Sequence, residues 1–251
     1  MIPFHSISSN GRTPLAGNNL LMVVLSCLSW VRYMGSITLY CDETAFKTLD
    51  KIGLTKFYSH INTEFLSSLS LNRKYWAAGK ILSMGEIGTG AFSVDIDLCI
   101  KKTLPIKEDF DVLVAHVEPF NCYLPLESIK LLNGVDYNSC NPLNTSLLYF
   151  KNKELQKKYL ESFKLHLSRG VGDMVFIEQR LLGMLSSDYK VKTLNPIANG
   201  PWVDNEYFTH YWKLKHDKSK EESLRIEILS KIASICKDLN CTDFYKSCRN
   251  I

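Results

Sequence analysis

Residues 92–100 read Phe-Ser-Val-Asp-Ile-Asp-Leu-Cys-Ile, so that apolar residues alternate with Ser93, Asp95, Asp97 and Cys99. An alternation with a period of two predicts a β-strand with one buried face. At a rise of about 3.3 Å per residue, the two carboxylates lie on the same side of such a strand, about 6.7 Å apart. Burying paired carboxylates costs several kcal/mol unless a cation or hydrogen-bond donors compensate. We therefore expect the pair to lie where the strand ends, facing a polar cleft, with a divalent metal carrying a phosphate as its partner.

The length and composition of the chain favour one large α/β domain that is not specialised for nucleic acid. The chain has 251 residues, of which 45% are hydrophobic and 22% are charged, values that are ordinary for a globular protein. Its 30 Lys and Arg residues exceed its 26 Asp and Glu residues by only four. This excess suits an anionic substrate or peripheral contact with an acidic membrane, and it is too small and too dispersed to indicate nucleic acid.

Cysteine usage and hydropathy favour a cytoplasmic protein. None of the eight cysteines forms a Cys-x-x-Cys pair, and Cys27, Cys41 and Cys99 lie inside apolar runs, where cysteine acts as a small hydrophobic residue. We therefore expect reduced thiols and no zinc site. The apolar run Leu20–Val31 is too short to span a bilayer, which takes about 20 residues, and it predicts a buried helix. No export signal is recognisable in the sequence, which also favours the cytoplasm.

Strands and helices are expected to alternate along the chain, a pattern typical of a parallel sheet with covering helices. The expected strands are 2–8, 36–41, 57–61, 92–100, 111–117, 144–150 and 189–194. The expected helices run from Asn18 or Asn19 to 33, from Asp42 or Thr44 to 53, and over 73–85, 125–134, 153–169, 175–185 and 219–239. Caps, glycines and a capping box at Ser219–Glu222 set these boundaries. We find no internal repeat and no linker.

Five short motifs occur in order between residues 70 and 216. They are Tyr75-Trp-Ala-Ala-Gly-Lys80, the Asp95-x-Asp97 strand with Leu104-Pro105 after it, Asn144–Phe150, Phe176-Ile-Glu178-Gln179, and His210-Tyr-Trp-Lys213-Leu-Lys215. In these motifs and their order the chain resembles the nucleotide-sugar glycosyltransferases of the GT-A fold. That group includes glycogenin-like enzymes, clostridial toxin glycosylating domains, and bacterial capsule and lipopolysaccharide transferases. The chain departs from their pattern at Thr145-Ser146, where many members have Ala-Gly, and at Lys213, where glycine is common.

The resemblance implies an α/β fold of the GT-A type, with a Rossmann-like mixed sheet flanked by helices and a C-terminal helix. It implies a single domain over residues 1–251, with a nucleotide-binding half at 1–105, an acceptor and sugar half at 106–216, and a helical tail at 217–251. The implied activity is transfer of a hexose from a nucleotide-diphosphate sugar to the hydroxyl of a glycan or another acceptor. A role in bacterial surface glycan assembly follows from the resemblance alone.

The resemblance also implies a metal site at the aspartate pair. Asp97 would bind Mn²⁺ or Mg²⁺ directly, Asp95 would bind the ribose or the metal through water, and His210 would complete the metal shell. Both ions favour carboxylate oxygens, and Mn²⁺ also accepts imidazole. Either ion would neutralise the negative charge that develops on a nucleoside diphosphate leaving group.

Further roles by resemblance fall on the other motifs. Lys80, Asn144 and Gln179 would contact the donor sugar nucleotide, and Lys215, with Lys213 as second choice, would neutralise its diphosphate. An inverting reaction would need a general base near the acceptor, for which Glu178 and Asp173 are the candidates, whereas a retaining reaction would leave the diphosphate itself to accept the proton. The donor base, the donor sugar, the acceptor and the oligomeric state are open at this stage.

Each of these residues also has a plainer interpretation. An Asp-x-Asp at a strand end often caps a loop, a helical lysine such as Lys80 is usually solvated, and Asp173 is a natural helix cap. His210 is compatible with a half-buried structural residue, and Glu178 with a surface charge.

Two other functions stay open beside the transferase. One is a non-catalytic nucleotide- or glycan-binding module of the same fold. The other is a haloacid-dehalogenase-like phosphatase that uses Asp95 as its nucleophile. Against the phosphatase, Leu98-Cys99-Ile100 replaces the usual x-Thr/Val-Leu, and the strand lies far from the N-terminus.

Overall fold

A computed structural model describes residues 1–9, 15–70, 72–119, 140–170, 173–197, 203–211 and 217–251. The chain divides into two compact units, each assembled from separate stretches of sequence. Unit 1 comprises residues 1–2, 71–93 and 106–198, and unit 2 comprises 3–70, 94–105 and 199–251.

Unit 2 begins with three parallel strands joined by helices. The strands are β1 (Ile2–Ile7), β2 (Thr38–Cys41) and β3 (His60–Asn62), with β2 in the middle. The helices that alternate with them are α1 (Gly17–Met34), α2 (Glu43–Lys51) and α3 (Glu64–Ser68). Every residue of β2 is buried, as expected for the middle strand of a parallel sheet.

Helix α1 is the buried helix that the apolar run at 20–31 predicts. All residues from Leu20 to Trp30 are buried, so this part of the helix is covered on every side. The helix ends at Gly35, whose φ of 92° is open to glycine at little cost. The next helix, α2, is capped by Asp42, whose carboxylate accepts a hydrogen bond from the Ala45 amide at 2.8 Å. In the part of the chain that the structure describes, no helix is both long enough and apolar enough to cross a bilayer.

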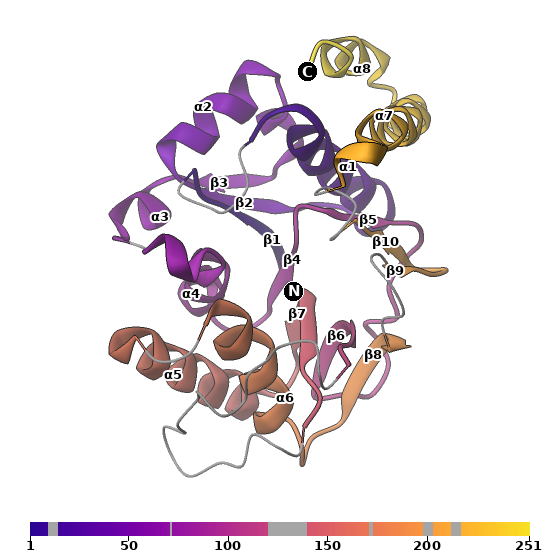
Figure 1. The fold of residues 1–251 in the computed structure, drawn as a ribbon. Helices are drawn as coiled ribbons and strands as arrows, with labels where there is room; N and C mark the ends of the chain where they lie inside the picture. The colour runs from indigo at the N-terminus through magenta and orange to yellow at the C-terminus, as the bar shows by residue number, and fades with distance from the viewer. Residues whose placement is uncertain (10–14, 71, 120–139, 171–172, 198–202, 212–216) are drawn as a thin grey trace. The chain divides into compact units, whose positions relative to one another are not determined.

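The rest of unit 2 is a small antiparallel sheet and a C-terminal helix pair. The sheet has the order β5 (Leu98–Ile100), β10 (Phe208–His210) and β9 (Val203–Asp204). The helices are α7 (Glu221–Asp238), preceded by a 3₁₀ turn at Lys218–Lys220, and α8 (Thr242–Cys248). Helix α7 packs against α1, and the two are drawn side by side in Figure 1.

Unit 1 holds the mixed part of the sheet. Its strands are β4 (Ala91–Val94), β7 (Leu143–Phe150), β6 (Val112–Val117) and β8 (Val191–Ile197), in that spatial order. Strand β6 is antiparallel to β7 and parallel to β8. The helices are α4 (Ala78–Ile87), α5 (Lys153–Arg169), a π-helix at Phe176–Arg180 and α6 (Leu181–Leu185). Helix α5 packs against α4, α6 and β7 (Figure 1).

The predicted α/β fold with a mixed sheet, flanking helices and a C-terminal helix is confirmed. The seven strands of the main sheet divide into β3-β2-β1 and β4-β7-β6-β8, and α7 is the expected C-terminal helix. Seven cysteines lie in the described residues as free thiols (27, 41, 99, 140, 236, 241 and 248), and Cys122 lies outside those residues. The helix expected at 125–134 also lies outside them. The arrangement of the chain as a single domain with boundaries at 105 and 216 stays a prediction.

The expectation of one strand over residues 92–100 is wrong. Strand β4 ends at Val94, residues 95–97 form a turn, and β5 begins at Leu98 in the small sheet. The expected single buried face is wrong too, because Ser93 and Cys99 are 1% and 4% exposed. Two short buried strands on either side of a turn produce the same alternation as one long strand. The expectation that the carboxylates lie where a strand ends is confirmed.

Three helices also differ from the sequence prediction, two in where they start and one in its type. The segment from Arg73 begins as a 3₁₀ turn capped by Asn72, and the α-helix starts only at Ala78. The helix predicted at 175–185 is a π-helix followed by a short α-helix. The capping box at 219–222 does not start α7, because the Asp217 carboxylate caps the 3₁₀ turn before it.

His5 lies at the centre of a buried hydrogen-bond network in unit 2. The side chain is fully buried, with Nδ1 2.8 Å from the Tyr58 hydroxyl and Nε2 3.0 Å from the Ser26 hydroxyl. Burial lowers the pKa of His5 to about 3, because the charged imidazolium would lose its hydration. The folded protein therefore excludes a proton that the unfolded chain binds below about pH 6.5.

This difference in proton binding makes the fold sensitive to acid. The contribution of neutral His5 to the free energy of unfolding is fully present above pH 6.5. It falls by about 1.4 kcal/mol per pH unit as the pH decreases from 6.5 toward 3. We expect the free energy of unfolding to drop between pH 7 and pH 4.5 by about 2–3 kcal/mol more in the wild type than in His5→Gln. Urea unfolding at the two pH values measures this difference. An equal drop in both proteins would contradict the assignment of the effect to His5.

Candidate metal centre

Asp95, Asp97 and His210 form a cluster of metal-ligating side chains in unit 2. Their ligand atoms all lie within 4.8 Å of one another. The two aspartates come from the turn between β4 and β5, and His210 is the last residue of β10, directly opposite Leu98 in the antiparallel pairing. Asp97 and His210 are 5% and 3% exposed, and the distance from His210 Nε2 to Asp97 Oδ1 is 3.6 Å. The three residues that the sequence assigns to the metal are thus brought together.

The turn that carries the two aspartates is held by hydrogen bonds to its main chain. The Ser26 hydroxyl on α1 donates to the Asp95 carbonyl at 3.0 Å, and the Tyr211 amide donates to the Asp97 carbonyl at 3.0 Å. The Ser29 hydroxyl, one turn along α1, accepts from the Ile100 amide at 3.0 Å. The backbone is therefore fixed on both sides of the carboxylates. The sequence analysis missed these serines, although two hydroxyls three residues apart in a fully buried helix were a signal for them.

The cluster fits a small divalent cation. Around an ion of the size of Mg²⁺ or Mn²⁺, with metal–oxygen bonds of about 2.0–2.2 Å, ligand atoms lie about 3–4.5 Å from one another. The spread of up to 4.8 Å between the three ligand atoms is close to that range. Two carboxylates and one imidazole are a donor set that Mn²⁺ accepts and that Mg²⁺ accepts less readily at the nitrogen.

Unit 1 contains a second polar cluster, which is centred on an ion pair. Lys80 on α4 lies 2.5 Å from Glu178 Oε1 on the π-helix, and their side chains are 8% and 1% exposed. The Thr145 hydroxyl on β7 also donates to Glu178 Oε1, and Lys80 Nζ donates to the Thr145 carbonyl at 3.2 Å. The Tyr159 hydroxyl donates to the Glu178 main-chain carbonyl at 2.8 Å. The plainer interpretation of Lys80 as a solvated lysine is wrong, because its side chain is buried and the Glu178 carboxylate compensates its charge.

The same cluster continues along the start of β7. The Asn144 side chain donates to Glu118 Oε1 at 2.8 Å and accepts from the Ser146 amide at 2.9 Å. Glu118 is 1% exposed and follows the end of β6, and the sequence analysis gave it no role. Gln179 is also buried and is carried by the π-helix. Single-turn π-helices are rare and are frequently found at functional sites.

Two atoms of this cluster have no hydrogen-bond partner within the described residues. They are Glu178 Oε2 and the Ser146 hydroxyl, and both are buried. A buried polar atom without a partner costs about 1–3 kcal/mol, so each such atom in a folded protein calls for an explanation.

Three further site residues were predicted from the sequence, and they are Asp173, Lys213 and Lys215. Asp173 is exposed, and its carbonyl accepts from the Ile177 amide at 3.1 Å, which places Asp173 at the start of the helical segment. Lys213 and Lys215 lie outside the described residues.

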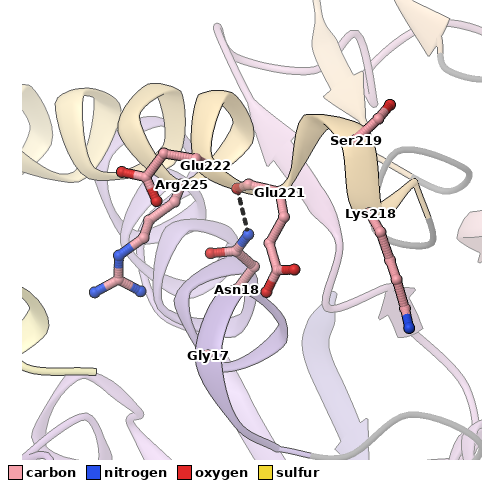
Figure 2. Close-up of a pocket in the computed structure, with 7 residues that line it drawn as sticks. All are labelled: Gly17, Asn18, Lys218, Ser219, Glu221, Glu222 and Arg225. Carbon is pink, nitrogen blue, oxygen red and sulfur yellow. Dashed lines mark hydrogen bonds between the residues drawn. The ribbon is translucent and has the colours of Figure 1, made fainter.

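The pocket in Figure 2 contains none of the predicted site residues. It has a volume of about 320 Å³ and lies in unit 2, where the beginnings of α1 and α7 meet. It is lined by Gly17, Asn18, Lys218, Ser219, Glu221, Glu222 and Arg225. The Asn18 side chain donates to the Glu221 carbonyl at 2.8 Å across it. Charges of both signs line the pocket, so its lining selects neither an anion nor a cation.

No family model matches the sequence, and no curated protein matches it. Solved structures with a similar fold include the PaToxG glycosyltransferase, at 11% identity over 99% of this chain and 86% of the other, with a TM-score of 0.46. The CTP:phosphocholine cytidylyltransferase LicC from Streptococcus pneumoniae matches at 11% identity over 89% of this chain and 100% of its own, with a TM-score of 0.47. The glycosyltransferase GlyE from Streptococcus pneumoniae TIGR4 matches at 12% identity over 77% of this chain and 45% of its own, with a TM-score of 0.41. At identities of 11–12% and TM-scores below 0.5, this likeness assigns no activity to the chain.

The buried ion pair of Lys80 and Glu178 leads to a prediction about the free energy of unfolding. Removing one partner leaves the other charge buried and uncompensated, so Lys80→Ala and Glu178→Ala should each lower the free energy of unfolding by about 3–5 kcal/mol. The double variant Lys80→Met/Glu178→Leu should be more stable than either single variant, because it buries no charge. Urea denaturation measures all three.

The exposed pair of Lys47 and Glu43 on α2 is the control for this prediction, since the two side chains are 72% and 59% exposed. Glu43→Ala should cost no more than about 0.5 kcal/mol. A loss in Glu178→Ala as small as the loss in Glu43→Ala would contradict the buried ion pair.

Proposed function

We propose that this protein is a divalent-metal-dependent glycosyltransferase that moves a sugar from a nucleotide-diphosphate sugar to an acceptor hydroxyl. The observation that carries the proposal is the Asp95, Asp97 and His210 cluster, whose ligand atoms lie within 4.8 Å of one another at the end of a buried strand. Hard cations bound by carboxylates are commonly shared with phosphate oxygens, which is the chemistry that a nucleoside diphosphate needs.

Each member of the cluster has a proposed task. Asp97 and His210, both buried and 3.6 Å apart, hold Mn²⁺ or Mg²⁺, and the more exposed Asp95 contacts the ribose or a water on the metal. The bound ion supplies charge neutralisation for the departing diphosphate. The hydrogen bonds to the Asp95 and Asp97 carbonyls would keep the carboxylates oriented, so that little reorganisation is needed as the sugar–phosphate bond breaks.

The polar cluster of unit 1 supports a ligand rich in hydroxyl groups. The buried Glu178 Oε2 and Ser146 hydroxyl have no hydrogen-bond partner among the described residues, and sugar hydroxyls would supply such partners. The roles expected for Lys80, Asn144 and Gln179 in donor binding stay predictions. We extend them in one respect: the carboxylate of Glu178 holds the Lys80 side chain in place.

The stereochemical course depends on where the proton of the acceptor goes. In an inverting reaction a carboxylate near the acceptor removes it. Of the two predicted candidates, Asp173 is exposed, whereas Glu178 is buried and paired with Lys80. We therefore prefer Asp173 as the base of an inverting reaction. In a retaining reaction the proton would pass to the diphosphate.

The proposal predicts binding of a nucleoside diphosphate that depends on metal. We expect at least one of UDP, GDP, CDP and ADP to raise the melting temperature of the protein in the presence of Mn²⁺ and not in the presence of EDTA. Asp97→Asn should weaken Mn²⁺ binding about 10-fold or more, because it removes a charged ligand. Thermal shift and Mn²⁺ titration measure the two effects.

Asp238→Asn is the control, since Asp238 is an α7 carboxylate that pairs with Arg32 at 2.7 Å and takes no part in the cluster. It should leave Mn²⁺ binding unchanged. Equal Mn²⁺ affinity in Asp97→Asn and the wild type would disprove the metal site. Metal-dependent nucleotide binding without sugar transfer to any acceptor would identify a binding module of this fold, and release of phosphate from a phosphomonoester would identify the phosphatase.

A further inference from the structure

Tyr211 is held by an ion pair on the C-terminal helix. Its hydroxyl donates to Glu227 Oε1 at 2.8 Å and accepts from Lys231 Nζ at 2.6 Å, and the Lys231 ammonium lies 2.7 Å from the same carboxylate. Glu227 and Lys231 are one turn apart on α7, so both face the tyrosine.

The main chain of the same residue is bonded to the aspartate turn. The Tyr211 amide donates to the Asp97 carbonyl at 3.0 Å, and Tyr211 directly follows His210 in the sequence. One residue is therefore hydrogen-bonded to the backbone of Asp97 and covalently joined to His210, which are the two buried members of the metal cluster. Tyr211 is itself only 1% exposed, so it has little room to move unless its anchors move.

We propose that Tyr211, anchored by Glu227 and Lys231 on α7, is a positioning residue that sets the separation of Asp97 and His210 for metal binding. This inference rests on the proposed function, because it presupposes that the cluster binds a metal. The charges of Glu227 and Lys231 lie on α7. Their effect would reach Asp97 and His210 through the Tyr211 ring and the Tyr211 peptide. Metal ligands have to be held within about 0.5 Å of the binding geometry. Loss of the contacts of Tyr211 with Glu227 or Lys231 should therefore weaken metal binding.

Through Glu227 and Lys231, helix α7 would have a role in metal binding as well as in the packing of unit 2. The helix has a second tie, the ion pair between Asp238 and Arg32 of α1, which does not involve Tyr211. The exposed fractions of the two α7 carboxylate side chains are nearly the same, 40% for Glu227 and 42% for Asp238. The two pairs therefore provide a matched comparison: one connects α7 to the cluster, and the other connects α7 only to α1.

The test compares Glu227→Gln and Tyr211→Phe with Asp238→Asn. Binding of Mn²⁺ alone is measured on the full chain by electron paramagnetic resonance of the free ion, with no nucleotide and no turnover. We expect Glu227→Gln and Tyr211→Phe to weaken Mn²⁺ binding by about 3- to 10-fold, less than the loss typical for a partner bonded directly to a metal ligand. Asp238→Asn should retain wild-type affinity. Excess Mn²⁺ should restore nucleotide binding in Glu227→Gln, which a general loss of stability would not permit.

The outcomes separate this inference from the proposed function. If the wild type binds Mn²⁺ and Glu227→Gln and Tyr211→Phe bind it equally well, the positioning role is refuted and the metal site stands. Equal weakening in Asp238→Asn and Glu227→Gln refutes it as well, because the effect then belongs to the packing of α7. Should Glu227→Gln not fold, Tyr211→Phe decides the question, since it keeps the ring and the amide. A wild type that binds no Mn²⁺ overturns both the metal site and the positioning role.

Discussion

Repulsion between the carboxylates of Asp95 and Asp97 is the constraint on which the arrangement of unit 2 depends. Two like charges within 4.8 Å of each other repel by about 3 kcal/mol or more at an effective dielectric constant of about 20. The surrounding structure has to hold the turn against this repulsion. It does so through the main chain, with Ser26 of α1 on the Asp95 carbonyl and the Tyr211 amide on the Asp97 carbonyl. The side chains of the two aspartates are grouped with that of His210, as the proposed cation would require.

The proposed shared cation would explain why residues 92–100 do not form one strand, since only it offsets the closer approach of the two carboxylates. In an unbroken strand the two carboxylates would point the same way about 6.7 Å apart, too far for one small ion together with an imidazole. Breaking the strand at Asp95 lets β5 leave the main sheet and pair with β10, which carries His210. The alternation of residue types cannot reveal the break, because it is the same on both sides of the turn. Local patterns did predict elements whose determinants are local, such as α5, where Asn152 caps the start and Gly170 ends the helix in the left-handed conformation.

Contacts between residues distant in sequence account for what the sequence did not predict. A lysine on an apolar helix appears solvated until Glu178, far along the chain, is known to lie beside it. The Tyr211 anchor is of the same kind, because the i,i+4 pair of Glu227 and Lys231 has the appearance of an ordinary surface pair. The candidate metal residues were predictable because short motifs carried them. The residues that hold them in place were not, since a buried serine or tyrosine is common in any core.

The two polar clusters make different physical demands, and these demands explain why each is built as it is. A cation site draws on negative charge, and the aspartate turn is held through its main chain, by the Ser26 hydroxyl on the Asp95 carbonyl and the Tyr211 amide on the Asp97 carbonyl. In unit 1 the charge of Glu178 is balanced by Lys80, while Thr145, Ser146 and Asn144 supply neutral polar atoms of the kind that the proposed sugar ligand would need. A lysine introduced beside Asp97 would compete with the proposed cation, and an unpaired buried glutamate in unit 1 would be strongly destabilising. Because the proposed metal ligands all lie in unit 2, Mn²⁺ affinity would report on the aspartate turn independently of any sugar contact, and loss of transfer with intact metal binding would point to the polar cluster of unit 1.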